Sequence, residues 1–404
     1  IGTALGRGTN NLFNRTPAWD RYVMTGGAAA GFAVATGAPA TGIIFALEEV
    51  HKRFSPMILM VALSSVVFAS LTAEALSIIF GRTTAMFSLT AFPSVPVNLC
   101  WMAIVSGVGA GIIALLFIKG FTLMYKLLSE KIKAVSIEVK LIFLFVLIGL
   151  VGLLLPSAVG SGHSVIDGIM IREYLWYMIL TLLAVKIILI ILCGGAGATG
   201  GLFIPILTIG ALTGGLLAEL MLLTGVPSEY YSVIVTVTIA SFLGATLRAP
   251  ITAIVFFIEA FSGFNNILFA ALGVLISFVL MEILGVKPLY EVVLERKLKV
   301  MHKDEVPRIA DMEAVVRKGA FVIGKTTRDI FWPPSCHVMT VVRAGKNFST
   351  DARMDKDGDK VLKEGDTLRL RIETYDIEET KKLIADLVGK QDYDDNDRLR
   401  SRMP

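Results

Sequence analysis

Residues 194–215 read GGAGATGGLFIPILTIGALTGG, in which glycines crowd the first eight residues and an apolar run follows from Leu202. Glycine lets backbone amides turn toward a ligand, and a helix beginning near Phe203 would direct its N-terminal N–H groups at the same point. At membrane depth, such irregular backbone is tolerated only where it is buried in protein or lines a cavity. The pattern predicts either an anion site at a half-helix N-terminus or a loop whose glycines permit close helix packing.

The rest of the chain has the composition of a membrane protein. Mean hydropathy is +0.70, and 54% of the 404 residues are hydrophobic against 18% charged. The apolar residues form helix-length blocks, so we expect a polytopic α-helical protein. One of these blocks, 230–261, is expected to be a pair of helices broken around Arg248-Ala249-Pro250. The expected spans are 22–50, 57–80, 99–125, 139–155, 174–193, 201–223, 230–261 and 267–285.

Basic residues are distributed unequally among the connections between these spans. Segments 51–53, 119–133 and 287–303 are rich in Lys and Arg, whereas 82–98, 156–175 and 226–231 hold few. By the positive-inside rule the basic connections face the cytoplasm, and the region after residue 300 does so too.

An internal repeat relates two of the apolar blocks. Residues 38–48 (APATGIIFALE) align with residues 249–259 (APITAIVFFIE). Proline stands where each helix would begin, and glutamate follows about two and a half turns later. Weak similarity between two halves is typical of transporters built from inverted repeats, with the site at the repeat interface. Chance similarity between two apolar helices is the alternative.

The composition changes sharply after about residue 300. We expect strands in 321–325, 337–343 and 362–370, with Glu364-Gly365-Asp366 forming a turn, and an amphipathic helix over 376–388. These elements predict a small α+β domain over 301–390, followed by a polar tail at 391–404.

Several motifs in order carry a resemblance to a known family. Gly201-Leu202-Phe203-Ile204-Pro205 resembles the GxFxP motif of the CLC chloride channel and transporter family. Ala38-Pro39 with the run Ile44–Glu49 resembles its sixth-to-eighth helix region, and Lys287-Pro288-Leu289-Tyr290 resembles its last membrane segment. The resemblance covers about residues 1–300. The region 301–390 more weakly resembles the TrkA-C (RCK C-terminal) regulatory module, through Gly324 and Gly365-Asp366.

The resemblance implies an anion site made by the backbone amides of Leu202, Phe203 and Ile204 and by the hydroxyl of Tyr290. Gly201 and Pro205 complete the motif. Chloride needs weak, fixed donors, and a helix N-terminus supplies partial positive charge of that kind. On the residues alone, Tyr290 could equally be a tyrosine of the interfacial aromatic belt.

Glu49 is the acid that bears most on mechanism. In the family, the second glutamate of this pair passes protons to and from the cytoplasm in exchangers, whereas passive channels usually carry a nonpolar residue there. A carboxylate in a partly buried place can shuttle protons. Its neighbour Glu48 is expected to be a solvated helix end, and Glu259 is expected to be structural.

The family's serine-bearing GSGIP loop and its GREGP loop, whose glutamate is the external gate, are not found in the chain. The opening IGTALGRG resembles the segment a few residues downstream of GREGP, so we expect this chain to be an N-terminally truncated piece that does not transport by itself. The resemblance implies a chloride/proton exchanger in the parent protein. The alternatives are a passive chloride or other anion channel and a non-transporting membrane-anchored ligand sensor. A fluoride-selective relative is less expected, because Tyr290 and Glu49 are both present.

The partners implied are chloride, protons, the lipid bilayer and a second copy of the chain in a homodimer. Span 174–193 is a candidate dimer surface. We expect an integral protein of a bacterial plasma membrane, with no cofactor beyond a small regulatory ligand on the C-terminal domain. No nucleic-acid partner is indicated. The sequence offers no nucleophile–base pair or phosphate loop to indicate an enzyme, and its four histidines and three cysteines (Cys100, Cys193 and Cys336) show no metal spacing.

Overall fold

The structure is a computed structural model, and its chain divides into two compact units. One unit comprises 33–50 and 73–295; the other comprises 1–32, 51–72 and 296–404. The structure describes residues 1–13, 15–52, 54–81, 87, 92–128, 135–198, 200–301, 307–333, 335–343, 346–349 and 361–390. The expected tail at 391–404 and parts of the expected loops 82–98 and 119–133 lie outside the described residues.

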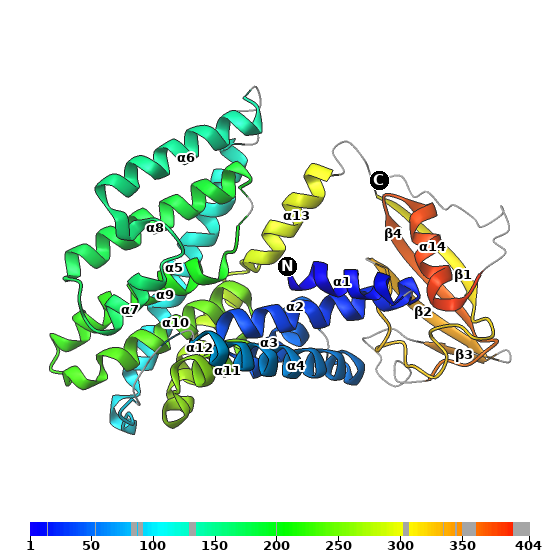
Figure 1. The fold of residues 1–404 in the computed structure, drawn as a ribbon, viewed down its shortest axis with the longest axis horizontal. Helices are drawn as coiled ribbons and strands as arrows, with labels where there is room; N and C mark the ends of the chain where they lie inside the picture. Colours follow the sequence, from blue (N-terminus) through cyan, green and yellow to red (C-terminus); the bar gives the residue numbers. More distant parts are fainter. Residues whose placement is uncertain are drawn as a thin grey trace. The chain divides into compact units, whose positions relative to one another are not determined.

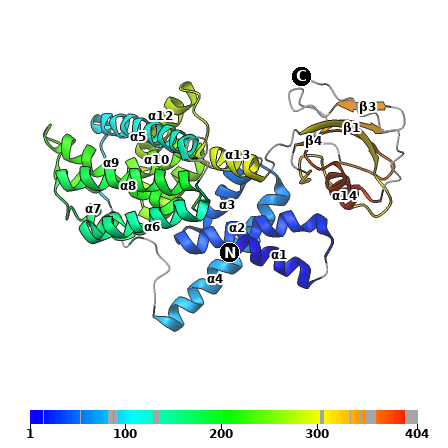
Figure 2. The same cartoon turned by 90° about the horizontal axis from the view of Figure 1, so that it is seen from above.

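The unit formed by 33–50 and 73–295 is helical, and α10 is its centre. Helix α10 is buried along its whole length and packs against α5, α9, α11 and α12, as Figures 1 and 2 show. The described helices are α3 Pro39–Phe45, α5 Trp101–Lys126, α6 Ile137–Leu154, α7 His163–Met170, α8 Trp176–Ala196, α9 Phe203–Leu222, α10 Tyr231–Leu247, α11 Pro250–Phe261, α12 Ile267–Ile283 and α13 Leu289–Met301, the last of which runs on beyond this unit.

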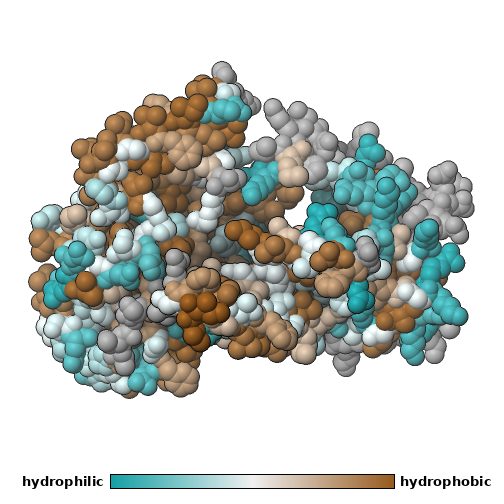
Figure 3. All heavy atoms as spheres, viewed as in Figure 1, coloured by the Kyte–Doolittle hydropathy of each residue, from teal (hydrophilic) through white to brown (hydrophobic). Residues whose placement is uncertain are grey.

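Seven helices among the described residues are long and apolar enough to cross a membrane, by length and composition. Their burial differs sharply: 89% of the α10 window is covered by protein against 6% of the α6 window. Apolar side chains such as Phe143 and Leu154 of α6 are exposed, and Figure 3 shows the hydrophobic surface over α6 and α8. An exposed apolar face of this kind suits contact with lipid. The spans are Pro56–Phe80, Val97–Lys126, Ile137–Leu154, Trp176–Ala196, Phe203–Leu222, Ser228–Leu247 and Phe264–Ile283.

The predicted break inside 230–261 is confirmed. Helix α10 ends at Leu247, Arg248 has φ +61°, and α11 begins at Pro250. The Arg248 guanidinium pairs with Glu282 and donates to the carbonyl of Met281 at 2.6 Å. These bonds hold the left-handed residue against the end of α12.

The expectation of one helix over 22–50 is wrong. Helix α2 (Asp20–Thr36) ends before Gly37, which has φ +63°, and α3 begins at Pro39. A left-handed residue ends a helix and proline favours the first position of the next one. The two breaks share their geometry, since Ala38 has φ −129°, ψ 81° and Ala249 has φ −121°, ψ 74°.

The second unit joins N-terminal helices to the C-terminal α+β region. Its sheet has the order β1-β4-β2-β3 and its described pairs are antiparallel. Alternate side chains of β4, such as Leu368 and Leu370, are buried in one core with Leu387 of α14. The elements are α1 Gly2–Leu12, the first part of α2, most of α4 (Pro56–Phe80), β1 Arg308–Val315, β2 Cys336–Arg343, β3 Lys346–Ser349, β4 Thr367–Thr374 and α14 Ile377–Val388.

Two expectations for this region need correction. Residues 321–325 are not a strand, because the amides of Ile323 and Lys325 donate three residues back and wind the chain into turns. The sequence analysis also missed β1, which is the neighbour of β4. The turn at Gly365 (φ +84°) and the helix capped by the Asp376 carboxylate are confirmed.

Lowering the pH is expected to destabilise the C-terminal α+β region, because the fully buried Asp366 then becomes protonated. Burial opposes its ionisation, but the Arg343 guanidinium, at 2.6 Å from both carboxylate oxygens, and the Lys363 amide hold its pKa below the ordinary value. The lowered pKa stabilises the fold above the unfolded-state pKa of about 3.9, and the contribution is lost as pH falls through the folded-state pKa. Amide exchange in β4 measured against pH should accelerate in that range. The same pH dependence in Asp366→Asn would contradict this assignment.

Candidate functional site

The glycine-rich stretch divides into two parts with different environments. A side-chain carbon at Gly194 would lie 2.0 Å from the ring of Phe121, so this glycine permits α8 to pack closely on α5. Gly197, with φ +84°, ends α8. At Gly200 and Gly201 an added carbon would meet open space. The first glycines therefore serve helix packing, whereas the last two leave room in front of α9.

Helix α9 begins where the sequence predicts. Leu202 is its N-cap residue. The first backbone hydrogen bond of the helix runs from the Ile206 amide to the Leu202 carbonyl at 3.0 Å. The amides of Phe203 and Ile204 therefore lie at the open end of the helix, while Pro205 has no N–H to contribute. The Phe203 ring packs edge-on against Phe256 of α11 at 5.5 Å. The start of α9 therefore offers partial positive charge next to Gly200 and Gly201, which have open space around them.

Glu49 lies one turn after Phe45, and Phe45 contacts Tyr290. Glu49 is only 9% exposed and lies in a π-helical turn over Ala46–Val50 that continues α3. Tyr290 is half-buried in the first turn of α13, and its ring lies 6.5 Å from that of Phe45. Single π-turns are rare and occur often at functional sites. The acid and the tyrosine that the sequence singled out separately thus lie on elements that are in contact through Phe45.

The contact between Tyr290 and the α9 N-terminus is indirect in the described residues. Leu202, Phe203 and Tyr290 are partly buried and pack against the same hydrophobic core. Phe256 links α9 to this core from α11, and Phe45 links Tyr290 to it from α3. Side chains of α3 and α11 therefore flank the predicted chloride-binding groups.

Glu48 and Glu259 form a reciprocal pair of helix caps. The Glu48 carboxylate accepts from the amides of Ile251 and Thr252 at 3.0 and 2.6 Å and from the Thr252 hydroxyl at 2.7 Å. The Glu259 carboxylate accepts from the amides of Ala40 and Thr41 at 2.8 and 2.7 Å and from the Thr41 hydroxyl at 2.7 Å. Helices α3 and α11 therefore run antiparallel, each capped by the far end of the other.

The expectation that Glu48 is a solvated helix end is wrong. Its carboxylate accepts hydrogen bonds from amides at the start of α11 that have no partner within that helix. The aligned repeat contained the signal, because Thr and Glu recur at the same positions in both copies. Two such copies packed antiparallel would place each glutamate at the other's first turn.

The fold defines a class of protein: a polytopic helical membrane protein whose described residues include seven helices long and apolar enough to cross a membrane. A voltage gated chloride channel family model matches residues 1–282. The chain belongs to this family, the CLC family.

Individual relatives agree with this assignment. The H(+)/Cl(−) exchange transporter ClcA of Klebsiella pneumoniae subsp. pneumoniae is 29% identical over 325 residues, covering 76% of this chain and 66% of the relative. The ClcA of Citrobacter koseri is 29% identical over 312 residues, covering 74% of this chain and 63% of the relative. The chain thus spans slightly less than two thirds of the length of these curated relatives.

Solved structures share the fold. A slow cyanobacterial Cl−/H+ antiporter has a TM-score of 0.67 at 28% identity, covering 74% of this chain and 69% of the other. A CLC-type fluoride/proton antiporter has a TM-score of 0.61 at 22% identity, covering 72% of this chain and 69% of the other. The second likeness concerns the fold alone.

Proposed function

We propose that the protein exchanges chloride for protons across a bacterial plasma membrane. The observation that carries the proposal is the buried Glu49 carboxylate, which lies one turn after Phe45, the residue whose ring packs against that of Tyr290. A carboxylate so placed can take a proton from one side and release it to the other, whereas a passive pore needs no titratable group there. The relatives named as exchange transporters support the same interpretation.

The anion site of this proposal consists of the Leu202, Phe203 and Ile204 amides and the Tyr290 hydroxyl, framed by Gly201 and Pro205. Helix-terminal amides hold an anion through partial charges, so chloride can bind and still leave. The open space at Gly200 and Gly201 supports this use of the turn. The matched breaks at Ala38 and Ala249 and the reciprocal caps support an inverted repeat in which α3 and α11 are counterparts.

The proposal extends to the surroundings of the transport region. Residues 301–390 are proposed to be a cytoplasmic regulatory domain of TrkA-C type that binds a small ligand, and the protein is proposed to work as a homodimer. The basic connections near 51–53 and 287–303 support a cytoplasmic position for the residues after α13.

Flux in proteoliposomes tests the function directly. The parent protein, with the segment expected upstream of Ile1 present, should move protons uphill when a chloride gradient is imposed, and chloride uphill when a proton gradient is imposed. Chloride flow without protons would favour the passive channel, and absence of both fluxes would favour the membrane-anchored sensor.

Replacing Tyr290 by Phe should weaken chloride binding without disturbing the fold. The variant loses one hydrogen bond to an anion, which costs about 1.5 kcal/mol or roughly tenfold in affinity. Isothermal titration with chloride in detergent measures the change. The matched control is Tyr177→Phe, because Tyr177 is 54% exposed on α8. Equal affinities for wild type and Tyr290→Phe would mean that Tyr290 is not an anion contact.

A further inference from the structure

Arg248 has a backbone conformation that the matching break earlier in the chain assigns to glycine. The two breaks agree at Ala38 and Ala249, and the residue before them is Gly37 with φ +63° in one and Arg248 with φ +61° in the other. Left-handed backbone costs energy for a residue that carries a Cβ atom, and glycine avoids this cost. Such an outlier persists only where its surroundings hold it, so the Arg248 side chain is expected to have a role that glycine lacks.

The backbone that follows α12 forms a regular helix ending. Gly285 is left-handed, with φ +59°, and its amide donates to the Glu282 carbonyl at 3.0 Å. The amide of the next residue, Val286, donates to the Met281 carbonyl at 3.3 Å. These two bonds form the Schellman motif that closes many helices. Carbonyls at a helix C-terminus carry partial negative charge, which favours a cation beside them.

The Arg248 guanidinium supplies that cation and bonds two carbonyls of the ending at once. Its Nη2 atom donates to the Met281 carbonyl at 2.6 Å and to the Val286 carbonyl at 2.5 Å. Its other terminal nitrogen pairs with the Glu282 carboxylate, and the guanidinium lies 5.7 Å from the centre of the Phe278 ring. The Arg248 side chain is only 10% exposed, and hydrogen bonds away from bulk water are electrostatically stronger. Arg248 therefore fixes the Val286 carbonyl to the end of α12.

Val286 precedes Tyr290, the proposed anion contact, by four residues. The link between them has little freedom, because Pro288 has a fixed φ and Leu289 is fully buried in the core of the helical unit. Helix α13 begins at Leu289, and the Val292 amide donates to the Pro288 carbonyl at 3.1 Å. A shift of the Val286 carbonyl would therefore move the first turn of α13, and the Tyr290 hydroxyl would move with it.

We propose that Arg248 is a positioning residue for chloride binding by Tyr290. This inference rests on the proposed function, in which the Tyr290 hydroxyl contacts the anion. Arg248 holds the Val286 carbonyl at the end of α12, and the short link 287–289 then sets the position of the hydroxyl. A site built from weak donors depends on their placement, so a displaced hydroxyl costs affinity although the donor itself is still present.

The experiment is a double-mutant cycle on chloride affinity, measured by isothermal titration in detergent. It uses the parent protein, with the segment expected upstream of Ile1 present. The four proteins are wild type, Arg248→Gly, Tyr290→Phe and the double variant. Glycine suits the left-handed backbone, so a loss of affinity in Arg248→Gly reports the lost side-chain bonds rather than backbone strain. Arg248→Lys replaces it in the cycle if the glycine variant does not fold, because lysine keeps the charge but cannot bond two carbonyls and a carboxylate together.

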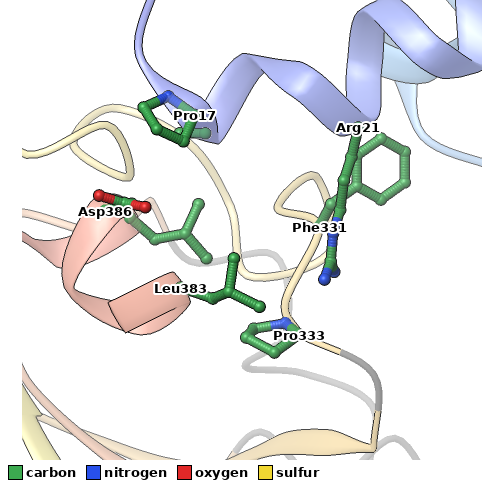
Figure 4. A pocket seen from close by; sticks show the side chains of 8 residues that line it. Pro17, Arg21, Phe331, Pro333, Leu383 and Asp386 are labelled. Atoms are coloured by element: carbon green, nitrogen blue, oxygen red, sulfur yellow. The ribbon is translucent and has the colours of Figure 1, made fainter. Parts of the chain in front are cut away.

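Two controls separate general damage from the loss of these bonds. Ser262→Gly changes an exposed residue that is also left-handed, with φ +50° after α11. Arg21→Ala removes a half-buried arginine of the other unit that donates to the Trp332 carbonyl at 2.5 Å. Figure 4 shows Arg21 beside Phe331 at a small pocket of that unit. Both controls should bind chloride as wild type does.

In Arg248→Gly we expect chloride affinity to fall roughly three- to tenfold, the upper end being the loss expected for the Tyr290 hydroxyl itself. In the Tyr290→Phe background the same change should alter affinity by less than about twofold, because the hydroxyl that Arg248 positions is already gone. Arg248→Lys should show a smaller loss with the same dependence on Tyr290. Amide hydrogen exchange over 284–292 should rise in Arg248→Gly, because the helix ending opens more easily.

Different results separate the inference from the proposed function. Equal losses of affinity in the two backgrounds would mean that Arg248 supports the helical unit in general, and the inference is overturned. Unchanged affinity in both Arg248 variants, or a loss of the same size in Arg21→Ala, would overturn it too. If Tyr290→Phe binds chloride as tightly as wild type, the proposed anion contact has failed, and the inference that depends on it falls as well.

Discussion

Replacing Glu49 by Gln is expected to abolish proton transport while chloride still crosses the membrane. Glutamine keeps the shape and polarity of the side chain but cannot bind or release a proton in the physiological range. Proton transfer by a positioned side chain is worth on the order of a hundredfold in rate, so we expect a loss of that size in proton flux. Simultaneous recording of external chloride and pH from proteoliposomes measures both fluxes.

The control is Glu229→Gln, because Glu229 is an exposed acid outside the site. It should leave both fluxes unchanged. Retained proton coupling in Glu49→Gln would mean that Glu49 is only the end of a helix. Loss of both fluxes would mean that Glu49 supports the site structurally, and in that case Glu49→Asp should restore chloride flux.

Removing either reciprocal cap is expected to destabilise the membrane unit. Glu48→Ala and Glu259→Ala each remove a carboxylate that accepts two amides and one hydroxyl. Helix caps contribute about 0.5–2 kcal/mol, and hydrogen bonds to charged groups about 1.5–3 kcal/mol. We therefore expect a loss of about 2 kcal/mol for each variant and a fall in Tm of roughly 4–8 °C in detergent.

The two losses should not add. Both carboxylates hold α3 against α11, so the second removal acts on a pair of helices that the first has already loosened. Glu48→Gln and Glu259→Gln should lose less than the alanine variants, because the amide oxygen still accepts. Unchanged Tm in Glu259→Ala together with a large fall in Glu48→Ala would contradict the reciprocal arrangement. Glu229→Ala is the surface control.

Local features of the site could be predicted from the sequence because they depend on residues close together in the chain. Glycine at 200–201 and proline at 205 specify a turn and a helix start whatever packs around them, and α9 begins at Phe203 as expected. The break at Arg248 followed from the same kind of signal. The break at Gly37 was missed within 22–50, because its small residues resembled those of a continuous packed helix.

The C-terminal errors have a similar cause. Apolar residues at 321–323 resemble a short strand, yet the Ile323 amide donates three residues back to Ala320 and the Val322 amide donates to the Leu387 carbonyl of α14. The Phe321 ring packs against Tyr22 of α2. The sequence of β1 is RIADMEAV, in which only Met312 and Ala314 are buried on one face, and the alternation is too short to stand out. Its place in the sheet depends on pairing with β4, over fifty residues away.

The order of residues along the chain was enough to specify the membrane-spanning helices and the break before α9. Apolar length, glycine freedom and the missing N–H of proline are properties of a residue and its near neighbours. The folded arrangement was needed to show that Glu48 caps α11, that Tyr290 packs against Phe45 of α3, and that Tyr22 is buried against the turn 329–331. The Glu48 bonds span 203 and 204 positions in the chain. A carboxylate satisfies whichever amides the packing of the helices brings to it, and that packing is a property of the whole chain.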